Sequence, residues 1–279
     1  MDGSWTNGID LALLHAVNGW AGNFALDHLV KQVEENPLLR GALFLTAFWG
    51  MWFHRAPKTS ARRERLLGIL FAVVAAVIAA RAVSLLFPFR VRPMYADGVG
   101  FVPLPFPVQY NLEDWSSFPS DTGAYFFAIA VGFWFFSRPL SIVAMLYTAL
   151  YICGPRLYLG IHWASDLLAG CLVGAAVTPF VVRSELVARL LSRPLIRFAE
   201  LRPGIFYAAF FLFTFEMVPL FTDARGIFHG LMLMAGKYGL PIGTIVALVA
   251  AVGTAVLAAC ALYVARILRD DRAAADAAD

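Results

Sequence analysis

The segment 66–87, LLGILFAVVAAVIAARAVSLLF, constrains the fold more than any other stretch of this 279-residue chain. One arginine is its only charged residue, and a hydrocarbon core about 30 Å thick requires roughly 20 apolar residues in a helix. The whole chain follows the same pattern, since 60% of its residues are hydrophobic and 15% are charged. A soluble domain is nearer half apolar and a quarter charged. The sequence therefore predicts an all-α, polytopic membrane protein.

Hydropathy along the chain predicts a helix bundle of about seven spans. The expected spans are 38–54, 66–87, 119–137, 140–157, 163–182, 204–221 and 240–265. Apolar and polar residues mix over 8–30, which indicates an amphipathic helix lying at the membrane interface. We expect three parts: a core with its N-terminal amphipathic helix (1–182), a basic cytoplasmic linker (183–203), and additional C-terminal transmembrane helices with a tail (204–279).

Lysine and arginine predict the orientation of these spans, because they accumulate on the cytoplasmic side. The basic regions are 54–65, 137–139, 183–202 and the tail after 265. With seven spans these regions share one side, which we assign to the cytoplasm. The outer side then holds the N-terminus and the segments 88–118, 156–162 and 222–239.

A few arginines depart from this distribution at the outer ends of spans. They are Arg81, Arg90, Arg92 and Arg156. Each one alone could extend its charged head to the interface. Ionisable residues near spans are costly and mostly functional, and arginine binds phosphate oxygens with two parallel hydrogen bonds. Their concentration on one face therefore favours an anion site.

The stretch WSSFPSDTGAYFF (115–127) offers a second component of such a site. Ser120, Asp121 and Thr122 precede an apolar helix, which is a good N-cap pattern. The free N–H groups of a helix N-terminus also favour an anion. Taken alone, the stretch would be interpreted as an ordinary cap.

The third component is His162, which is followed four residues later by Asp166. If both lay on one helix, they would share a face. A carboxylate could then hold one imidazole nitrogen and leave the other as nucleophile or base. A helix-stabilising pair is the alternative interpretation.

Together the three stretches resemble the type 2 phosphatidic acid phosphatase superfamily of membrane lipid phosphatases and phosphotransferases. Its pattern is Lys-x6-Arg-Pro, then Pro-Ser-Gly-His, then Ser-Arg-x5-His-x3-Asp. The third motif is present from Arg156 to Asp166, with proline in place of the leading serine. The first keeps Arg92-Pro93 but has Leu85 at the lysine position. The second keeps Pro119-Ser120 and continues with Asp121-Thr122.

The resemblance covers roughly 8–182 and implies a role for each matching residue. His162 would be the nucleophile that forms a phosphohistidine, with Asp166 orienting it. Arg92, Arg156 and Ser120 would bind the phosphate, and Arg81 or Arg90 could replace the lysine charge.

The histidine of the second motif, which protonates the leaving alkoxide in the family, is replaced here by Thr122. General acid help contributes about 10²–10⁴-fold, and a lipid alkoxide needs it more than a phosphate leaving group does. Asp121 could serve only if burial raised its pKa, which the nearby arginines oppose. The vacancy favours a diphosphate substrate, a phosphotransferase or slow phosphatase, or a site that binds without turnover.

We therefore expect a lipid phosphatase acting on a polyprenyl diphosphate. A lipid phosphotransferase, a non-catalytic lipid-phosphate binder or transporter, and a purely structural membrane protein are the alternatives. No metal or other cofactor is implied, because one histidine and one aspartate are too few ligands. Nucleic acid is not an expected partner, and the basic loops favour anionic lipids. The expected location is the bacterial inner membrane, with the site facing the periplasm or exterior.

Overall fold

The computed structural model describes residues 5–54, 59–106 and 112–220, and these residues form helices without any strand. The chain divides into two compact units, Met1–Pro194 and Leu195–Asp279, and each is considered by itself. The predicted span 240–265 lies outside the described residues, and the proposed division at 182 and 203 stays a prediction.

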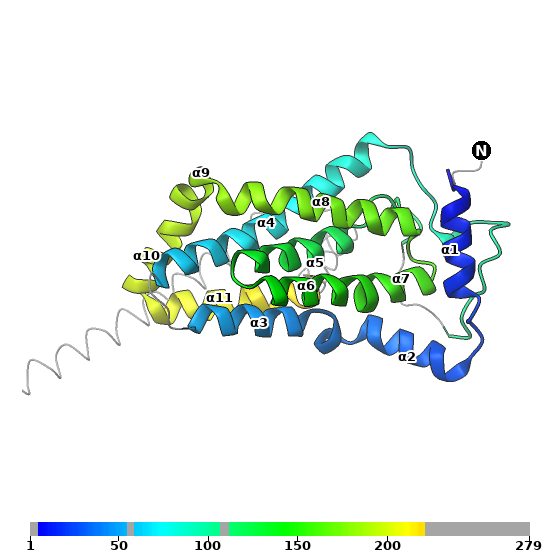
Figure 1. The fold of residues 1–279 in the computed structure, drawn as a ribbon, viewed down its shortest axis with the longest axis horizontal. Coiled ribbons are helices and arrows are strands. Elements are labelled where there is room, and N and C mark those ends of the chain that lie inside the picture. The colour runs from blue at the N-terminus through cyan, green and yellow to red at the C-terminus, as the bar shows by residue number, and fades with distance from the viewer. Residues whose placement is uncertain (1–4, 55–58, 107–111, 221–279) are drawn as a thin grey trace, which may run out of the picture. The chain divides into compact units, whose positions relative to one another are not determined.

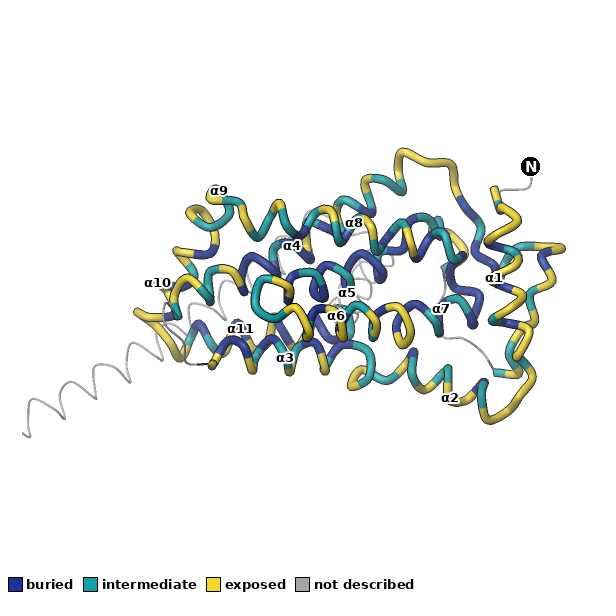
Figure 2. Tube along the Cα trace, in the orientation of Figure 1, coloured by how far each residue is buried: buried dark blue, intermediate teal, exposed yellow. Residues whose placement is uncertain are grey.

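Three helices form the centre of the first unit: α4 (Thr59–Leu86), α5 (Asp121–Gly132) and α8 (Ala164–Arg183). Each packs against the other two, and Figure 1 shows them running lengthwise beside one another. Almost every residue of α5 is buried, as the dark blue tube in Figure 2 shows. A helix that is apolar on all sides belongs in such a position.

The close approach of α5 and α8 depends on Gly170. A Cβ atom added at Gly170 would lie 2.1 Å from the carbonyl oxygen of Ser120, so no other residue fits. Small residues allow membrane helices to pack with their backbones nearly in contact. This contact brings the N-terminus of α5 beside the first turn of α8, where the Ser120 amide donates to the Asp166 carbonyl at 3.0 Å.

The short 3-10 helix Phe133–Phe135 extends α5, and the chain then turns at Phe136 and Ser137. The next helical segment is continuous and consists of α6 (Arg138–Tyr147), the π-helix Thr148–Cys153 and α7 (Gly154–Tyr158). Ser137 caps α6 by accepting from the Leu140 amide at 3.3 Å. After α7 the chain turns at Gly160, whose φ of +66° lies in the left-handed region. This turn separates α7 from α8 and carries His162.

The N-terminal region contains two helices, whereas the sequence predicts one over 8–30. They are α1 (Gly8–Asn18) and α2 (Phe24–Glu35). Between them Gly22 has a φ of +96°, and Asn23 caps α2 by accepting from the Leu26 amide at 3.2 Å. Both helices pack on α7, and α1 also contacts α8. Figure 1 shows α1 across one end of the helices α4 to α8.

The other helices of the described residues are divided between the two units. In the first are the π-helix Leu38–Ala42, α3 (Leu43–Phe53), the 3-10 helix Pro93–Tyr95, α9 (Glu185–Val187) and the π-helix Ala188–Ser192. Helix α10 (Arg193–Leu201) begins at the boundary, and α11 (Pro203–Met217) belongs to the second unit.

Six apolar helices coincide with six of the predicted spans. Thr59–Leu86, Arg138–Tyr158 and Ala164–Arg183 are long and apolar enough to cross a membrane. The shorter apolar helices are Leu38–Phe53, Asp121–Phe135 and Pro203–Met217. The fold is therefore an all-α membrane helix bundle, as the sequence predicts.

Candidate active site

The predicted site residues gather at the end of the bundle that α1 crosses. They lie on the end of α4, on the loops before α5, at the start of α5, and around the turn between α7 and α8. Most of them are buried. The three motifs therefore form one cluster, although the partners of the individual side chains differ from the sequence-based expectation.

His162 is 2% exposed and contacts two other groups of the cluster through its ring nitrogens. Nδ1 lies 2.9 Å from the Ser117 carbonyl oxygen, and Nε2 lies 3.4 Å from Nη1 of Arg92. A carbonyl oxygen only accepts, so Nδ1 carries the proton and Nε2 presents its lone pair. The imidazole is therefore held in the tautomer that a nucleophilic Nε2 requires.

Asp166 lies farther from His162 than the predicted pairing implies. Its Oδ2 is 3.7 Å from Nδ1, beyond hydrogen-bond distance, and accepts instead from the Trp163 amide at 2.9 Å. His162 precedes α8, which begins at Ala164, so the two residues do not share a helix face. The turn brings them together, and Asp166 acts on His162 through its charge while the Ser117 carbonyl orients the ring.

Burial is the main reason that the pKa of His162 lies below its ordinary value. The positive charges of Arg92 and Arg156 lower this pKa further, whereas Asp166 opposes the shift. Desolvation and like charges both disfavour an imidazolium. At neutral pH His162 is accordingly a neutral base, and its unprotonated Nε2 faces Nη1 of Arg92.

Arg92 is 5% exposed and is held by backbone carbonyl groups. Its Nη1 donates to the Ile161 carbonyl at 2.7 Å, and its Nη2 to the Ser116 carbonyl at 3.4 Å. Within the described chain no carboxylate lies within ion-pair distance of its guanidinium. Burial and the charge of Arg156 lower the pKa of Arg92 to about 10, so it stays protonated at neutral pH.

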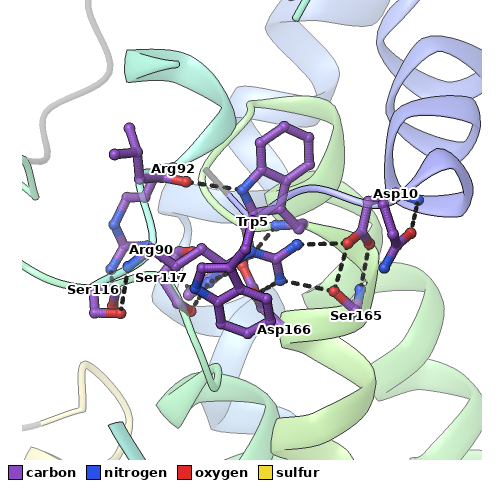
Figure 3. A network of polar contacts seen from close by, with 12 residues as sticks. Trp5, Asp10, Arg90, Arg92, Ser116, Ser117, Ser165 and Asp166 are labelled. Atoms are coloured by element: carbon purple, nitrogen blue, oxygen red, sulfur yellow. Dashed lines mark hydrogen bonds and ion pairs between the residues drawn. The ribbon is translucent and has the colours of Figure 1, made fainter. Parts of the chain in front are cut away.

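Arg90, two residues earlier, has a different environment. It is fully buried and forms ion pairs with Asp166 and, at 2.5 Å, with Asp10 of α1 (Figure 3). Its guanidinium also lies over the rings of Trp5 and Trp163, at 4.4 and 5.5 Å from the ring centroids. These contacts occupy both terminal nitrogens, and they do not support the predicted contact between Arg90 and phosphate.

Arg156 and Arg81 also have carboxylate partners. Arg156 donates to Oε1 of Glu34 at 2.8 Å, and both side chains are buried. Arg81 pairs with Asp121 at the rim of the cluster, where the two side chains are 37% and 29% exposed. Of the four outer arginines, only Arg81 is appreciably accessible to solvent.

The second motif forms the N-terminus of α5. Ser120 is fully buried and caps the helix by accepting from the Gly123 amide at 3.2 Å. Asp121 accepts from the Thr122 amide at 2.9 Å. Thr122, where the family has histidine, is 4% exposed. The cap interpretation is thus correct for Ser120, and its predicted contact with phosphate stays a prediction.

Sequence reasoning missed the carboxylates that α1 and α2 contribute, namely Asp10 and Glu34. Both are about 1% exposed. A signal was present for Asp10, which is a lone acid in an otherwise apolar stretch. The serine pair Ser116 and Ser117 was also missed, although only Phe118 separates it from the second motif. Over the described ranges no group of three or more His, Cys, Asp or Glu could hold a metal ion.

Comparisons with known proteins identify the family of this chain. Residues 90–188 match the family model of the PAP2 superfamily. The Escherichia coli (strain K12) protein named "Putative undecaprenyl-diphosphatase YbjG" is 31% identical over 172 residues, which are 60% of this chain and 77% of that protein. The chain belongs to the PAP2 superfamily. The family expected from the three motifs is confirmed, and membership supports a lipid phosphatase activity.

A solved structure, the crystal structure of Aquifex aeolicus LpxE, is 22% identical to the chain. The match covers 64% of this chain and 97% of that chain, with a TM-score of 0.45. The PAP2 segment 90–188 includes Arg92, His162 and Asp166. Asp10 and Glu34 lie outside it, so two buried partners of the PAP2 arginines come from the N-terminal helices.

Proposed function

We propose that this protein is a membrane phosphatase that hydrolyses a polyprenyl diphosphate through a phosphohistidine at His162. The observation that carries the proposal is the position of Nε2 of His162, 3.4 Å from a guanidinium nitrogen of Arg92. The proton of the same ring is held at Nδ1 by the Ser117 carbonyl. A nucleophile beside a buried cation is the arrangement that phosphoryl transfer requires.

In the proposed first step, Nε2 attacks the distal phosphorus, and the bond between that phosphorus and the bridging oxygen breaks. Polyprenyl monophosphate leaves with the bridging oxygen, and the distal phosphoryl group stays on Nε2. Asp166 stabilises the positive charge that the imidazole ring acquires. In the second step water attacks the phosphohistidine, inorganic phosphate is released, and His162 returns to its starting state.

Unused hydrogen-bond donors support an anion at this point. Nε of Arg92 and the hydroxyl of Ser117 are buried and have no hydrogen-bond partner among the described residues. Both residues contact His162 through other atoms. Buried polar atoms are rarely left unpaired, and phosphate oxygens would accept from both.

Thr122 supports a diphosphate rather than a monoester. It occupies the position of the family's acid, and a threonine hydroxyl does not protonate an alkoxide at neutral pH. Asp121 does not replace the acid, because a carboxylate paired with Arg81 and accepting from the Thr122 amide is a proton acceptor. A phosphate leaving group needs little protonation, so the proposed substrate avoids the missing group.

The distribution of basic residues supports an outward-facing site. Arginines at the end of the bundle away from His162 include Arg62, Arg63, Arg138, Arg183 and Arg189. By the positive-inside rule that end is cytoplasmic. The site then faces the periplasm or exterior of a bacterial inner membrane, and the basic end contacts anionic lipids.

The test measures phosphate release from farnesyl diphosphate and from phosphatidic acid by the purified full-length protein in detergent. Release from the diphosphate should be abolished in His162→Ala and retained in His28→Ala, an exposed histidine of α2. Equal turnover by wild type and His162→Ala would overturn the proposal. A requirement for a lipid acceptor would indicate a phosphotransferase, and binding without turnover would indicate a lipid-phosphate binder.

A further inference from the structure

We propose that Asp10 of α1 is a positioning residue for His162 and acts through Arg90. It lies outside the segment that matches the PAP2 superfamily. The inference rests on the proposed role of His162 as nucleophile. It assigns a function at the site to an N-terminal helix that the sequence places at the membrane interface.

The contacts of Asp10 join α1 firmly to the start of α8 (Figure 3). Its Oδ2 accepts from Nη2 of Arg90 at 2.5 Å and from the Ser165 hydroxyl at 2.7 Å. Its Oδ1 accepts from the Ser165 amide at 2.9 Å. The carboxylate is 1% exposed, and Arg90 is fully buried. Such a charged cluster is costly to bury unless hydrogen bonds satisfy its charges. Both oxygens of Asp10 and both terminal nitrogens of Arg90 have partners.

Two routes lead from Arg90 to the imidazole of His162. Through its side chain, Nη1 donates to Oδ1 of Asp166, whose Oδ2 lies 3.7 Å from Nδ1 of His162. Through its backbone, the Arg90 carbonyl accepts from the Ser117 amide at 2.9 Å. The Ser117 carbonyl is in turn the group bound to Nδ1. Arg90 therefore supports both neighbours of the protonated ring nitrogen.

The charge count explains why Arg90 needs a second carboxylate. If Asp166 were its only partner, the pair would be neutral and would do little for a positively charged imidazole. With Asp10 present, two carboxylates share one guanidinium, and the cluster keeps one net negative charge beside His162. The imidazole becomes positive when Nε2 attacks phosphorus. The negative charge of the cluster stabilises it most strongly because the site excludes water.

The sign of the effect on His162 follows from this charge. The other charged groups that act on the ring are Arg92, Arg156, Asp121 and Asp166. Removing the Asp10 charge leaves the arginines less balanced, and it allows Arg90 to draw Asp166 toward itself. Both changes lower the pKa of His162 and weaken Nε2 as a nucleophile.

The chain offers a matched control in Asp27 of α2. This carboxylate is also fully buried, and its partners are neutral: the Tyr158 hydroxyl at 2.5 Å and the Gly22 amide at 3.1 Å. It has no contact with Arg90, Asp166 or His162 in the described part of the chain. Asp27→Asn therefore reports what the loss of a buried N-terminal carboxylate does to folding alone.

The experiment compares Asp10→Asn, Asp10→Ala and Asp27→Asn in the full-length protein in detergent. We expect Asp10→Asn to lower kcat on farnesyl diphosphate about tenfold with little change in KM, because it weakens a transition-state interaction. In the pH profile of kcat/KM, the fall in activity on the acid side (the acid limb) should move to lower pH in Asp10→Asn. Asp27→Asn should lower Tm but leave the acid limb unchanged and kcat within about twofold of wild type.

A second readout does not depend on turnover. NMR titration of histidine-labelled protein, with His162→Gln identifying the signal, should show a lower pKa of His162 in Asp10→Asn than in Asp27→Asn. An equal pKa in both variants, or kcat losses that follow Tm alone, would overturn the inference. If wild type releases no phosphate, the proposed hydrolysis fails, and the titration still decides whether Asp10 acts on His162.

Discussion

Arg90 and Arg92 lie two residues apart in one loop, and both are buried beside His162. Arg90 is held by two carboxylates and two indole rings. Arg92 is held by backbone carbonyl groups and approaches Nε2 of the histidine. The same residue type is therefore the centre of a structural ion cluster at position 90 and part of a candidate anion site at position 92.

The difference shows that an arginine in a phosphatase motif should be interpreted from its partners. Carbonyl groups orient a guanidinium without neutralising it, so Arg92 keeps its attraction for phosphate. Carboxylates on Arg90 remove that attraction and convert the residue into support for Asp166 and Ser117. Substitutions at the two arginines and at their neighbours test this contrast.

Arg92→Ala should lower kcat/KM on farnesyl diphosphate by about 10²–10³-fold, because it removes a buried donor to the transferring phosphoryl group. Arg92→Lys should lose less but stay well below wild type, since an ammonium cannot reproduce the guanidinium geometry. Steady-state kinetics measure both. An Arg92→Ala variant with wild-type kinetics would contradict the phosphate role of Arg92.

Arg90→Gln should reduce stability most, because it leaves Asp10 and Asp166 buried with one cation fewer. Removing one partner of a buried pair costs about 3–5 kcal/mol. Thermal unfolding in detergent measures the loss, and Asp10→Asn combined with Arg90→Gln should restore part of it. Arg193→Gln is the control, because its ion pairs with Glu64 and Glu185 are exposed and should contribute little. Equal Tm losses at Arg90 and Arg193 would remove the contrast.

Thr122→His should raise activity on phosphatidic acid about tenfold or more and change activity on farnesyl diphosphate little, since only the alkoxide needs an acid. The ratio of the two kcat/KM values is the measurement. Thr122→Val, which adds no acid, is the control. A similar gain on both substrates would contradict the account of the missing acid.

The acid limb of kcat/KM should distinguish Arg92 from Asp10 by direction. Only neutral His162 attacks, so activity is present above its pKa and is lost as pH falls through it. Burial and the arginines lower this pKa, which places the wild-type limb at a lower pH than the pKa of an exposed histidine. Arg92→Gln should move the limb to higher pH and Asp10→Asn to lower pH. Shifts in the same direction would contradict the charge assignment.

Arg81→Ala should have the smallest effect. It should lower kcat/KM roughly a few-fold on farnesyl diphosphate and by less on a lipid monophosphate. Arg81 is partly exposed and pairs with Asp121, and exposed pairs contribute little. At the rim it can move to the second phosphate group of the substrate. Equal losses on both substrates, measured as kcat/KM, would assign Arg81 to support of α5.

The bundle could be predicted because hydropathy is a local property. Six of the expected spans match apolar helices, and the spacing from Arg156 through His162 to Asp166 identified the segment that carries the proposed nucleophile. The motif pattern also identified the family. Each span and each single motif is a local signal, although the three motifs together extend from Leu85 to Asp166.

The partners of the arginines could not be predicted in the same way. Asp10 and Arg90 are 80 residues apart, and Glu34 and Arg156 are 122 apart. No local pattern links them, because only the packing of α1 and α2 on α7 and α8 brings them together. The expected placement of His162 and Asp166 on one helix face was wrong, since α8 begins after His162. The turn before α8 nevertheless brings the two side chains within 3.7 Å.

The most direct test of the central claim is a rapid-quench experiment with a prenyl diphosphate labelled in its distal phosphate. The account predicts a labelled protein intermediate that is labile in acid and stable in alkali, the behaviour of a phosphohistidine. Label should be absent from His162→Ala and present in His28→Ala. An alkali-labile intermediate, or equal labelling of His162→Ala and wild type, would contradict His162 as the nucleophile.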